Sequence, residues 1–239
     1  MKKTYLLITI GLLIVSCEKS QEEILTDYSN IMTLKVENDN AYADNFDKIK
    51  LVAEFPENFN TEDDGKVDFY IYKDTEEHLT EPIRLVQENG VLKKICDVYV
   101  KHNKNESLNI KAVIKIGGIE TSKTTTIVFK KAFFDNLNIF SSALTVNSNS
   151  FSTIQLTSEL TRDNGIVTLN SLAETEVKDN LGNTIGIFTN YKNKTDATGK
   201  IINNFTLGNN NYSGILYAIT SSINEQGTIK KDTITLYAN

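Results

Sequence analysis

Apolar and polar side chains alternate along most of the chain after about residue 31. The segments 49–55, 67–71, 154–160 and 215–219 place apolar residues mainly at every second position. A period of two over a short run is typical of a strand with one buried face. Thr, Val, Ile, Tyr and Phe are frequent in these runs, and Asn, Asp, Gly and Ser separate them, as expected for strands joined by turns. The pattern predicts an all-β protein.

No segment after residue 17 has a helical period over a dozen residues, and the nearest case, 75–79, is too short for a helix. About seven strands fit in each half of the chain. In the first half we expect strands at 31–37, 48–55, 67–72, 82–87, 91–100, 108–116 and 123–130. In the second half we expect strands at 138–146, 152–160, 172–178, 184–189, 200–207, 213–221 and 229–237.

Three segments of the first half recur in the second half at nearly constant spacing. The matched pairs are 49–55 with 154–160, 89–92 with 198–201, and 126–129 with 233–236. Agreement among three separate pairs indicates two tandem copies of one domain. We expect the copies to be residues 30–131 and 132–239. Seven strands in about 100 residues is the size of an immunoglobulin-like sandwich.

The first seventeen residues have a different character. Lys2 and Lys3 precede an apolar run at residues 6–15, which ends at Ser16 and Cys17. A basic start followed by a short apolar run is typical of a secretory signal peptide. The run is much shorter than the roughly 20 residues of a membrane-spanning helix. We expect residues 1–16 to be a cleaved signal peptide.

The residues Ile14-Val15-Ser16-Cys17 resemble the bacterial lipobox, in which a small residue precedes an invariant Cys. The resemblance implies cleavage before Cys17, a diacylglycerol on its sulfur, and an acyl chain such as palmitate on the new α-amine. Bacterial lipoboxes usually carry Leu where this chain has Ile14. Several acyl chains on one residue give stable membrane anchoring.

Residues 17–29 are the expected lipidated tether, and their segment 18–23 is rich in Glu. This segment loosely resembles the acidic signal by which some Gram-negative bacteria send lipoproteins to the outer face of the outer membrane. A solvated tether is the alternative interpretation. We therefore expect a lipid-anchored protein of the outer membrane, facing either the cell surface or, alternatively, the periplasm.

Composition narrows the possible functions. The chain has 239 residues, with 25 Lys and Arg against 31 Asp and Glu, and a net charge of −6. An acidic chain with a pI near 5.1 is unsuited to binding nucleic-acid phosphates. With Cys17 lipidated, no disulfide is expected. Cys96 lies in a predicted strand and is expected to be a small buried residue.

Candidate catalytic and metal-binding residues are few. His78 and His102 are the two histidines, and both are expected in solvated loops. The acidic pairs Asp63-Asp64 and Glu76-Glu77 are expected in solvated turns, because the sequence has no Asp-x-Asp-x-Asp-Gly calcium loop. It also has no phosphate-binding Gly loop and no zinc-type Cys pattern. We expect no enzyme, no catalytic residue, no cofactor and no metal.

The turn residues resemble those of bacterial Ig-like domains of the invasin/intimin type. In the first copy the resemblance lies in residues 40–44, 66–69 and 88–91, and in the second copy in residues 164–165, 179–182 and 195–200. It implies two tandem immunoglobulin-like β-sandwiches. Antibody domains carry a characteristic Trp and a disulfide. The chain has no Trp and is expected to form no disulfide, which agrees with the bacterial type.

Together these observations favour an outer-membrane-anchored lipoprotein that acts as a structural, adhesive or protein-binding module. The alternative is an accessory subunit of an outer-membrane glycan-uptake or secretion complex. An accessory module of a carbohydrate-active enzyme is the least favoured possibility. Besides the membrane, the expected partner is a protein or a surface glycan. An exposed aromatic platform would favour the glycan, and the candidate residues are Tyr70, Tyr72, Tyr191 and Tyr212.

Overall fold

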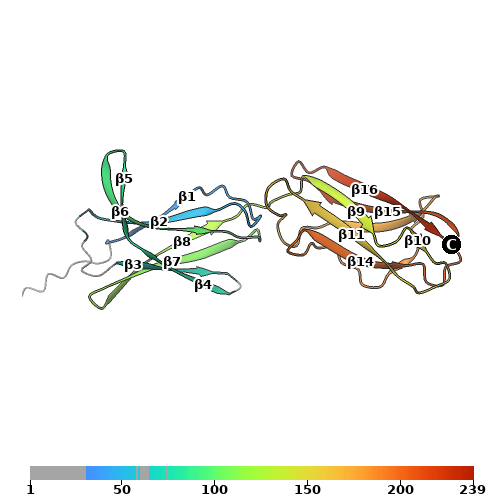
Figure 1. The fold of residues 1–239 in the computed structure, drawn as a ribbon, viewed down its shortest axis with the longest axis horizontal. Helices are drawn as coiled ribbons and strands as arrows, with labels where there is room; N and C mark the ends of the chain where they lie inside the picture. The colour runs from blue at the N-terminus through green and yellow to red at the C-terminus, as the bar shows by residue number, and fades with distance from the viewer. Residues whose placement is uncertain (1–30, 58, 60–64, 74) are drawn as a thin grey trace, which may run out of the picture.

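A computed structural model describes residues 31–57, 59, 65–73 and 75–239. Within these residues the chain forms sixteen strands and no helix. The described part of the chain accordingly has no helix with the length and apolar character needed to cross a membrane. Figure 1 shows two groups of strands arranged end to end along the long axis of the molecule. The predicted fold class, all-β with two tandem immunoglobulin-like sandwiches, is confirmed.

The first sandwich is built from two four-stranded antiparallel sheets with the orders β1-β2-β6-β5 and β4-β3-β7-β8. Its strands are β1 (Thr33–Glu37), β2 (Ile49–Phe55), β3 (Lys66–Tyr72), β4 (Glu76–Pro82), β5 (Arg84–Glu88), β6 (Val91–Val100), β7 (Ser107–Ile116) and β8 (Ile119–Val128). The predicted alternation sets which side chains face inward. In β3, Val67, Phe69 and Ile71 are fully buried between more exposed neighbours.

The second sandwich also has two four-stranded sheets, with the orders β13-β14-β11-β9 and β10-β16-β15-β12. Its strands are β9 (Asn136–Ser141), β10 (Thr145–Val146), β11 (Ile154–Thr161), β12 (Glu174–Asp179), β13 (Ile187–Phe188), β14 (Lys200–Thr206), β15 (Gly214–Ile223) and β16 (Ile229–Ala238). All pairings are antiparallel except the short parallel contact of β10 with β16.

The two sandwiches share one strand topology. The order β1-β2-β6-β5 of the first corresponds to β9-β11-β14-β13 of the second, and β3-β7-β8 corresponds to β12-β15-β16. The parallel contact of β10 with β16 also has a counterpart, the parallel bridge between Tyr42 and Lys130. The recurring segments of the sequence therefore lie on equivalent strands, because 49–55 is β2 and 154–160 lies in β11.

Two strand predictions were wrong. Residues 76–82 form β4, which pairs with β3 from Lys66 to Tyr72, although no strand was expected there. β4 is an edge strand with half-buried and exposed residues, so its sequence carries no apolar alternation. The single strand expected at 138–146 is instead divided into β9 and β10 by a break at residues 142–144. The chain there passes from one sheet to the other.

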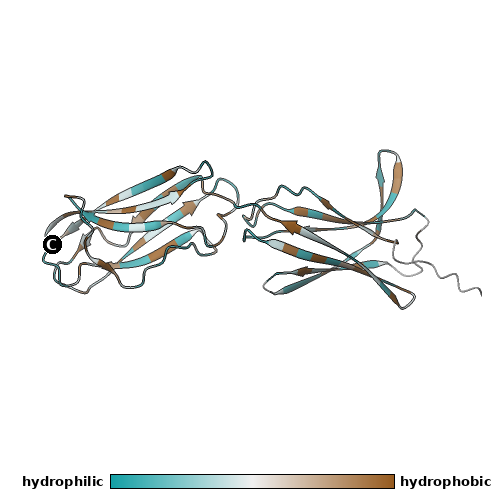
Figure 2. Ribbon diagram, turned by 180° about the vertical axis from the view of Figure 1, so that it is seen from behind, coloured by the Kyte–Doolittle hydropathy of each residue, from teal (hydrophilic) through white to brown (hydrophobic). Residues whose placement is uncertain are grey.

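Each sandwich is held by its own hydrophobic core. The inward faces of both sheets of the first sandwich form one cluster that includes Phe69, Leu51, Ile110 and Phe129. The second sandwich has a large cluster around Phe205 and Leu216. It also has a smaller cluster, whose buried members are Phe134, Leu160, Val167, Ala173 and Ile201. Figure 2 shows apolar and polar residues alternating along the strands of both sandwiches.

Cys96 is fully buried in β6, as predicted, and its thiol donates a hydrogen bond to the carbonyl of Glu81 at 3.3 Å. Burial raises the pKa of this thiol to about 12, and the nearby charges of Glu81 and Asp97 act in the same direction. A buried thiol of this kind is unreactive because the thiolate is the nucleophile.

We expect Cys96 to resist thiol reagents in the folded chain. In the Cys17→Ala variant, a disulfide reagent such as dithionitrobenzoate at pH 8 should label no thiol until denaturant is added, since unfolding returns the pKa to its ordinary value. The labelling rate should then follow the unfolding transition. Rapid labelling of the folded variant would contradict burial of Cys96.

Candidate functional site

The predicted site residue Cys17 lies outside the described residues, as do Asp63 and Asp64. His78 and the pair Glu76-Glu77 lie on strand β4, and not in the loop and turn that the sequence suggested. Within the described residues no group of three His, Cys, Asp or Glu side chains could hold a metal ion.

His78 is part of a small cluster on the outer face of β3 and β4. Its ring stacks on Tyr70 with the ring centroids 4.6 Å apart. Its Nε2 lies 3.2 Å from Asp68, whose carboxylate also accepts a hydrogen bond from the Thr80 hydroxyl at 2.6 Å. The hydrogen bond from Thr80, with help from His78, lowers the pKa of Asp68. These contacts join the edge strand β4 to β3.

His102 lies in a loop, as expected, but it is buried and therefore not solvated. Its Nε2 lies 2.6 Å from the carboxylate of Glu106, and its ring packs against Phe129. The carbonyl of His102 accepts a hydrogen bond from the amide of Asn45 at 3.0 Å. His102 thus fixes two loops at the end of the first sandwich that faces the second.

The four candidate tyrosines do not form a common platform. Tyr70 and Tyr72 lie on β3 of the first sandwich, whereas Tyr191 and Tyr212 lie in loops of the second. Tyr72 and Tyr191 are exposed, and Tyr70 and Tyr212 are partly buried. The hydroxyl of Tyr212 donates to the carbonyl of Ile215 at 2.8 Å.

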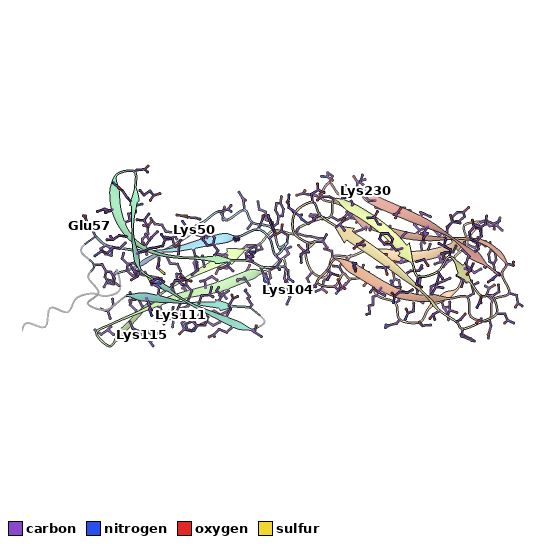
Figure 3. The ribbon with its side chains drawn as sticks, viewed as in Figure 1. Lys50, Glu57, Lys104, Lys111, Lys115 and Lys230 are labelled. Carbon is purple, nitrogen blue, oxygen red and sulfur yellow. The ribbon has the colours of Figure 1, made fainter. Side chains whose placement is uncertain are left out.

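The junction between the two sandwiches brings together buried polar contacts from loops of both. Two backbone hydrogen bonds cross it directly. The amide of Ile166 donates to the carbonyl of Asp44 at 2.9 Å, and the amide of Leu169 donates to the carbonyl of Asn103 at 2.7 Å. Figure 3 shows side chains of both sandwiches meeting here, with Lys104 labelled at the contact.

Thr168 joins three segments at the junction. Its buried hydroxyl accepts a hydrogen bond from the amide of Ala132 at 2.7 Å and donates one to the carbonyl of Ala43 at 3.1 Å. Its own amide donates to the carbonyl of Ala132 at 3.1 Å. Ala132 begins the second copy expected from the sequence. One threonine of the second sandwich therefore binds both the connecting segment and a loop of the first.

An ion pair crosses the same contact. A guanidinium nitrogen of Arg162 lies 3.5 Å from the carboxylate of Asp44, and only 1% of Asp44 is exposed. The other Asp44 oxygen accepts the amides of Phe46 and Asp47. Arg162 also donates to the carbonyl of Phe133 at 2.9 Å and lies over the ring of Tyr42. Removing one partner of a buried pair leaves an uncompensated charge, which typically costs about 3–5 kcal/mol.

Gly165 allows the two sandwiches to approach this closely. Its φ is +74°, and a Cβ built on it would lie 2.8 Å from the Asp44 carbonyl oxygen and 2.9 Å from the Phe46 Cβ. The turn at 164–165 was one of the sequence motifs. The sequence does not indicate Arg162 or Thr168 as contact residues. A polar residue in a turn has no periodic pattern that would reveal a partner distant in sequence.

No protein-family model matches the chain, and no curated protein matches it. Among solved structures, the chain is similar to the Yersinia pseudotuberculosis adhesin InvE, with a TM-score of 0.50 and 14% identity over 87% of this chain and 59% of InvE. It is also similar to invasin, a bacterial integrin-binding protein, with a TM-score of 0.56 and 12% identity over 87% of this chain and 39% of that structure.

The fold is that of bacterial Ig-like domains of the invasin/intimin type. The resemblance inferred from the turn residues is confirmed. At these identities the likeness concerns the fold, and the chain spans less than two thirds of either relative.

Substituting Gly165 tests the close contact at the junction. Gly165→Ala should destabilise the chain by about 2 kcal/mol or more, because left-handed backbone strain adds to a clash with the loop of Asp44. Thermal unfolding of the purified chain measures the effect.

Gly182 offers a matched control, since its φ is +86° and a Cβ there would meet nothing within 4 Å. Gly182→Ala should therefore cost only the backbone strain, about 1 kcal/mol. Equal losses for both variants would contradict the contact at Gly165.

Proposed function

We propose that the chain is an exported lipoprotein of the outer membrane that acts as an adhesive or structural module of the cell surface. In this proposal residues 1–16 are the signal peptide, Cys17 carries the lipid, and residues 17–29 are the tether. Residues 30–131 and 132–239 are then two sandwiches that hold a binding surface away from the membrane.

One observation carries the proposal, namely the joined, end-to-end arrangement of the sandwiches. Ile31, the first described residue, precedes β1 at the end of the first sandwich remote from the junction. The loops that follow β12 and β14 lie at the opposite end of the molecule, near the label C in Figure 1. A membrane anchor before Ile31 would thus stand at one end and these loops at the other.

The comparisons support an adhesive role by analogy of fold. InvE is named an adhesin, and invasin is named a bacterial integrin-binding protein. A fold hosts many functions, so the specific partner has to come from this chain's own surface.

A specific observation favours the second candidate function, an accessory subunit of an outer-membrane glycan-uptake or secretion complex. The hairpin of β5 and β6 projects from the first sandwich in Figure 1. Its side chains Leu85, Val91 and Leu92 are exposed. Leu85 and Leu92 lie on one face of the hairpin and Val91 on the other. Exposed apolar side chains on a projecting hairpin favour a contact with another protein.

Replacing Cys17 tests the anchor. Cys17→Ala should move the protein from the membrane fraction to the soluble fraction of lysed cells, because no acyl chain can then be attached to the residue. Cys96→Ala is the control, since it also removes a thiol and should leave the protein with the membranes. Unchanged membrane partitioning of Cys17→Ala would contradict the proposal.

The same strains separate the two faces of the membrane. Protease added to intact cells should degrade the unaltered chain if it faces the surface. Complete resistance in intact cells, with cleavage after the outer membrane is opened, would instead indicate the periplasmic face.

A further inference from the structure

The loops at the end of the second sandwich remote from the junction form one continuous surface. They comprise residues 147–153, 180–186, 207–213 and Asn239, and we call them the far-end loops. The amide of Asn149 donates to the carbonyl of Asn210 at 2.9 Å, and the amide of Ser148 donates to the carbonyl of Asn239 at 2.7 Å. The hydroxyl oxygen of Tyr212, whose proton is donated to Ile215, lies 3.4 Å from the side-chain oxygen of Asn180.

The far-end loops contain no charged side chain, although charged residues make up 23% of the chain. Asparagine is their commonest residue, and serine is also frequent. The carboxylate of Asp179, which directly precedes loop 180–186 at the end of β12, is buried and accepts the amides of Leu181 and Asn183. Hydrogen bonds from Asn183 first, and from the backbone, lower the pKa of Asp179. The Asp179 carboxylate therefore stabilises the turn at residues 180–183 and is not available to a ligand.

Phe151 is the most exposed aromatic side chain among the described residues, with 65% of its surface accessible. The backbone just before it is held in place. The buried Thr206 hydroxyl donates to the carbonyl of Ser150 at 2.9 Å, and Ser150 forms a bridge with Gly208. A Cβ built on Gly208 would lie 3.5 Å from the ring of Phe151. The Phe151 ring therefore lies beside the backbone of Gly208, while most of the side-chain surface faces solvent.

Several asparagine side chains of the far-end loops have free hydrogen-bonding groups. Within the described part of the chain, the side-chain amides of Asn149, Asn209 and Asn211 form no hydrogen bond. All three are exposed. An asparagine amide offers two donors and one acceptor, which matches a hydroxyl group that both donates and accepts.

We infer that the far-end loops bind a neutral saccharide. This inference rests on the proposed function and names the class of partner. A sugar ring has an apolar face that fits against Phe151, and its hydroxyl groups fit the free amides. An acidic glycan would call for Lys or Arg, and the far-end loops have neither. The hydrogen-bonded backbone at Ser150 reduces the ordering cost of binding.

The test uses affinity electrophoresis of the full chain, purified in detergent, in native gels that each contain one polysaccharide. The neutral probes are mannan, galactan, xyloglucan and β-1,3-glucan, and the anionic probes are polygalacturonate and heparin. At least one neutral probe should retard the chain, and the anionic probes should not. Retardation by none of the neutral probes, or by anionic probes to the same extent, would overturn the inference.

Two aromatic variants locate the contact. Phe151→Ala should weaken retardation by the bound neutral probe at least about tenfold. Tyr99→Ala is the matched control, because Tyr99 is a similarly exposed ring on β6 of the first sandwich, and it should leave retardation unchanged. Unweakened binding by Phe151→Ala would overturn the inference even if a polysaccharide binds.

Asn211→Asp is a second variant that should fold like the unaltered chain. It leaves Phe151 in place and only replaces the amide group of an exposed side chain by a carboxylate. It should also weaken binding to the neutral probe, since two hydrogen-bond donors are lost. Membrane partitioning of these variants should match the unaltered chain. Loss of saccharide binding with anchoring retained thus separates this inference from the proposed function.

Discussion

The ion pair between Asp44 and Arg162 is the interaction on which the arrangement of the two sandwiches depends. Asp44 is buried. Its backbone carbonyl accepts a hydrogen bond from Ile166, one carboxylate oxygen accepts backbone amides, and the other lies near Arg162. A buried carboxylate is costly unless it is paired and hydrogen-bonded. Separating the sandwiches would take away its arginine and the backbone bond from Ile166. The contact therefore favours one relative position of the two domains over an ensemble of positions.

Each sandwich is otherwise self-contained. Its core comes from alternating apolar residues on two sheets, and Cys96, the free cysteine among the described residues, is buried in the first core. Because each core is separate, the loops at the ends of a sandwich can differ between the two copies without changing the packing of the strands. The loops of the first sandwich at the junction make polar contacts with its neighbour, whereas the far-end loops of the second present amides and an aromatic ring to solvent.

The strands could largely be predicted from the sequence because burial of one face imposes a period of two, as in residues 66–72. The recurrence of three segments at nearly constant spacing also predicted that two such sandwiches follow each other in the chain. Edge strand β4 escaped prediction, since half of an edge strand's environment is solvent and polar residues such as Glu76 and His78 satisfy it. His102 was placed correctly in a loop, but its burial depends on Phe129, which follows β8 and is distant in sequence. Contacts between residues distant in sequence, such as Arg162 with Asp44, leave no local pattern.

Pulsed electron–electron double resonance can measure whether the junction between the sandwiches is fixed. Spin labels at Thr124→Cys on β8 and Lys230→Cys on β16 would report the distance between the sandwiches, in a Cys17→Ala chain whose Cys96 is buried. A fixed junction predicts one narrow distance distribution, which broadens when Arg162→Ala removes the ion pair. A broad distribution in the chain that retains Arg162 would contradict the account.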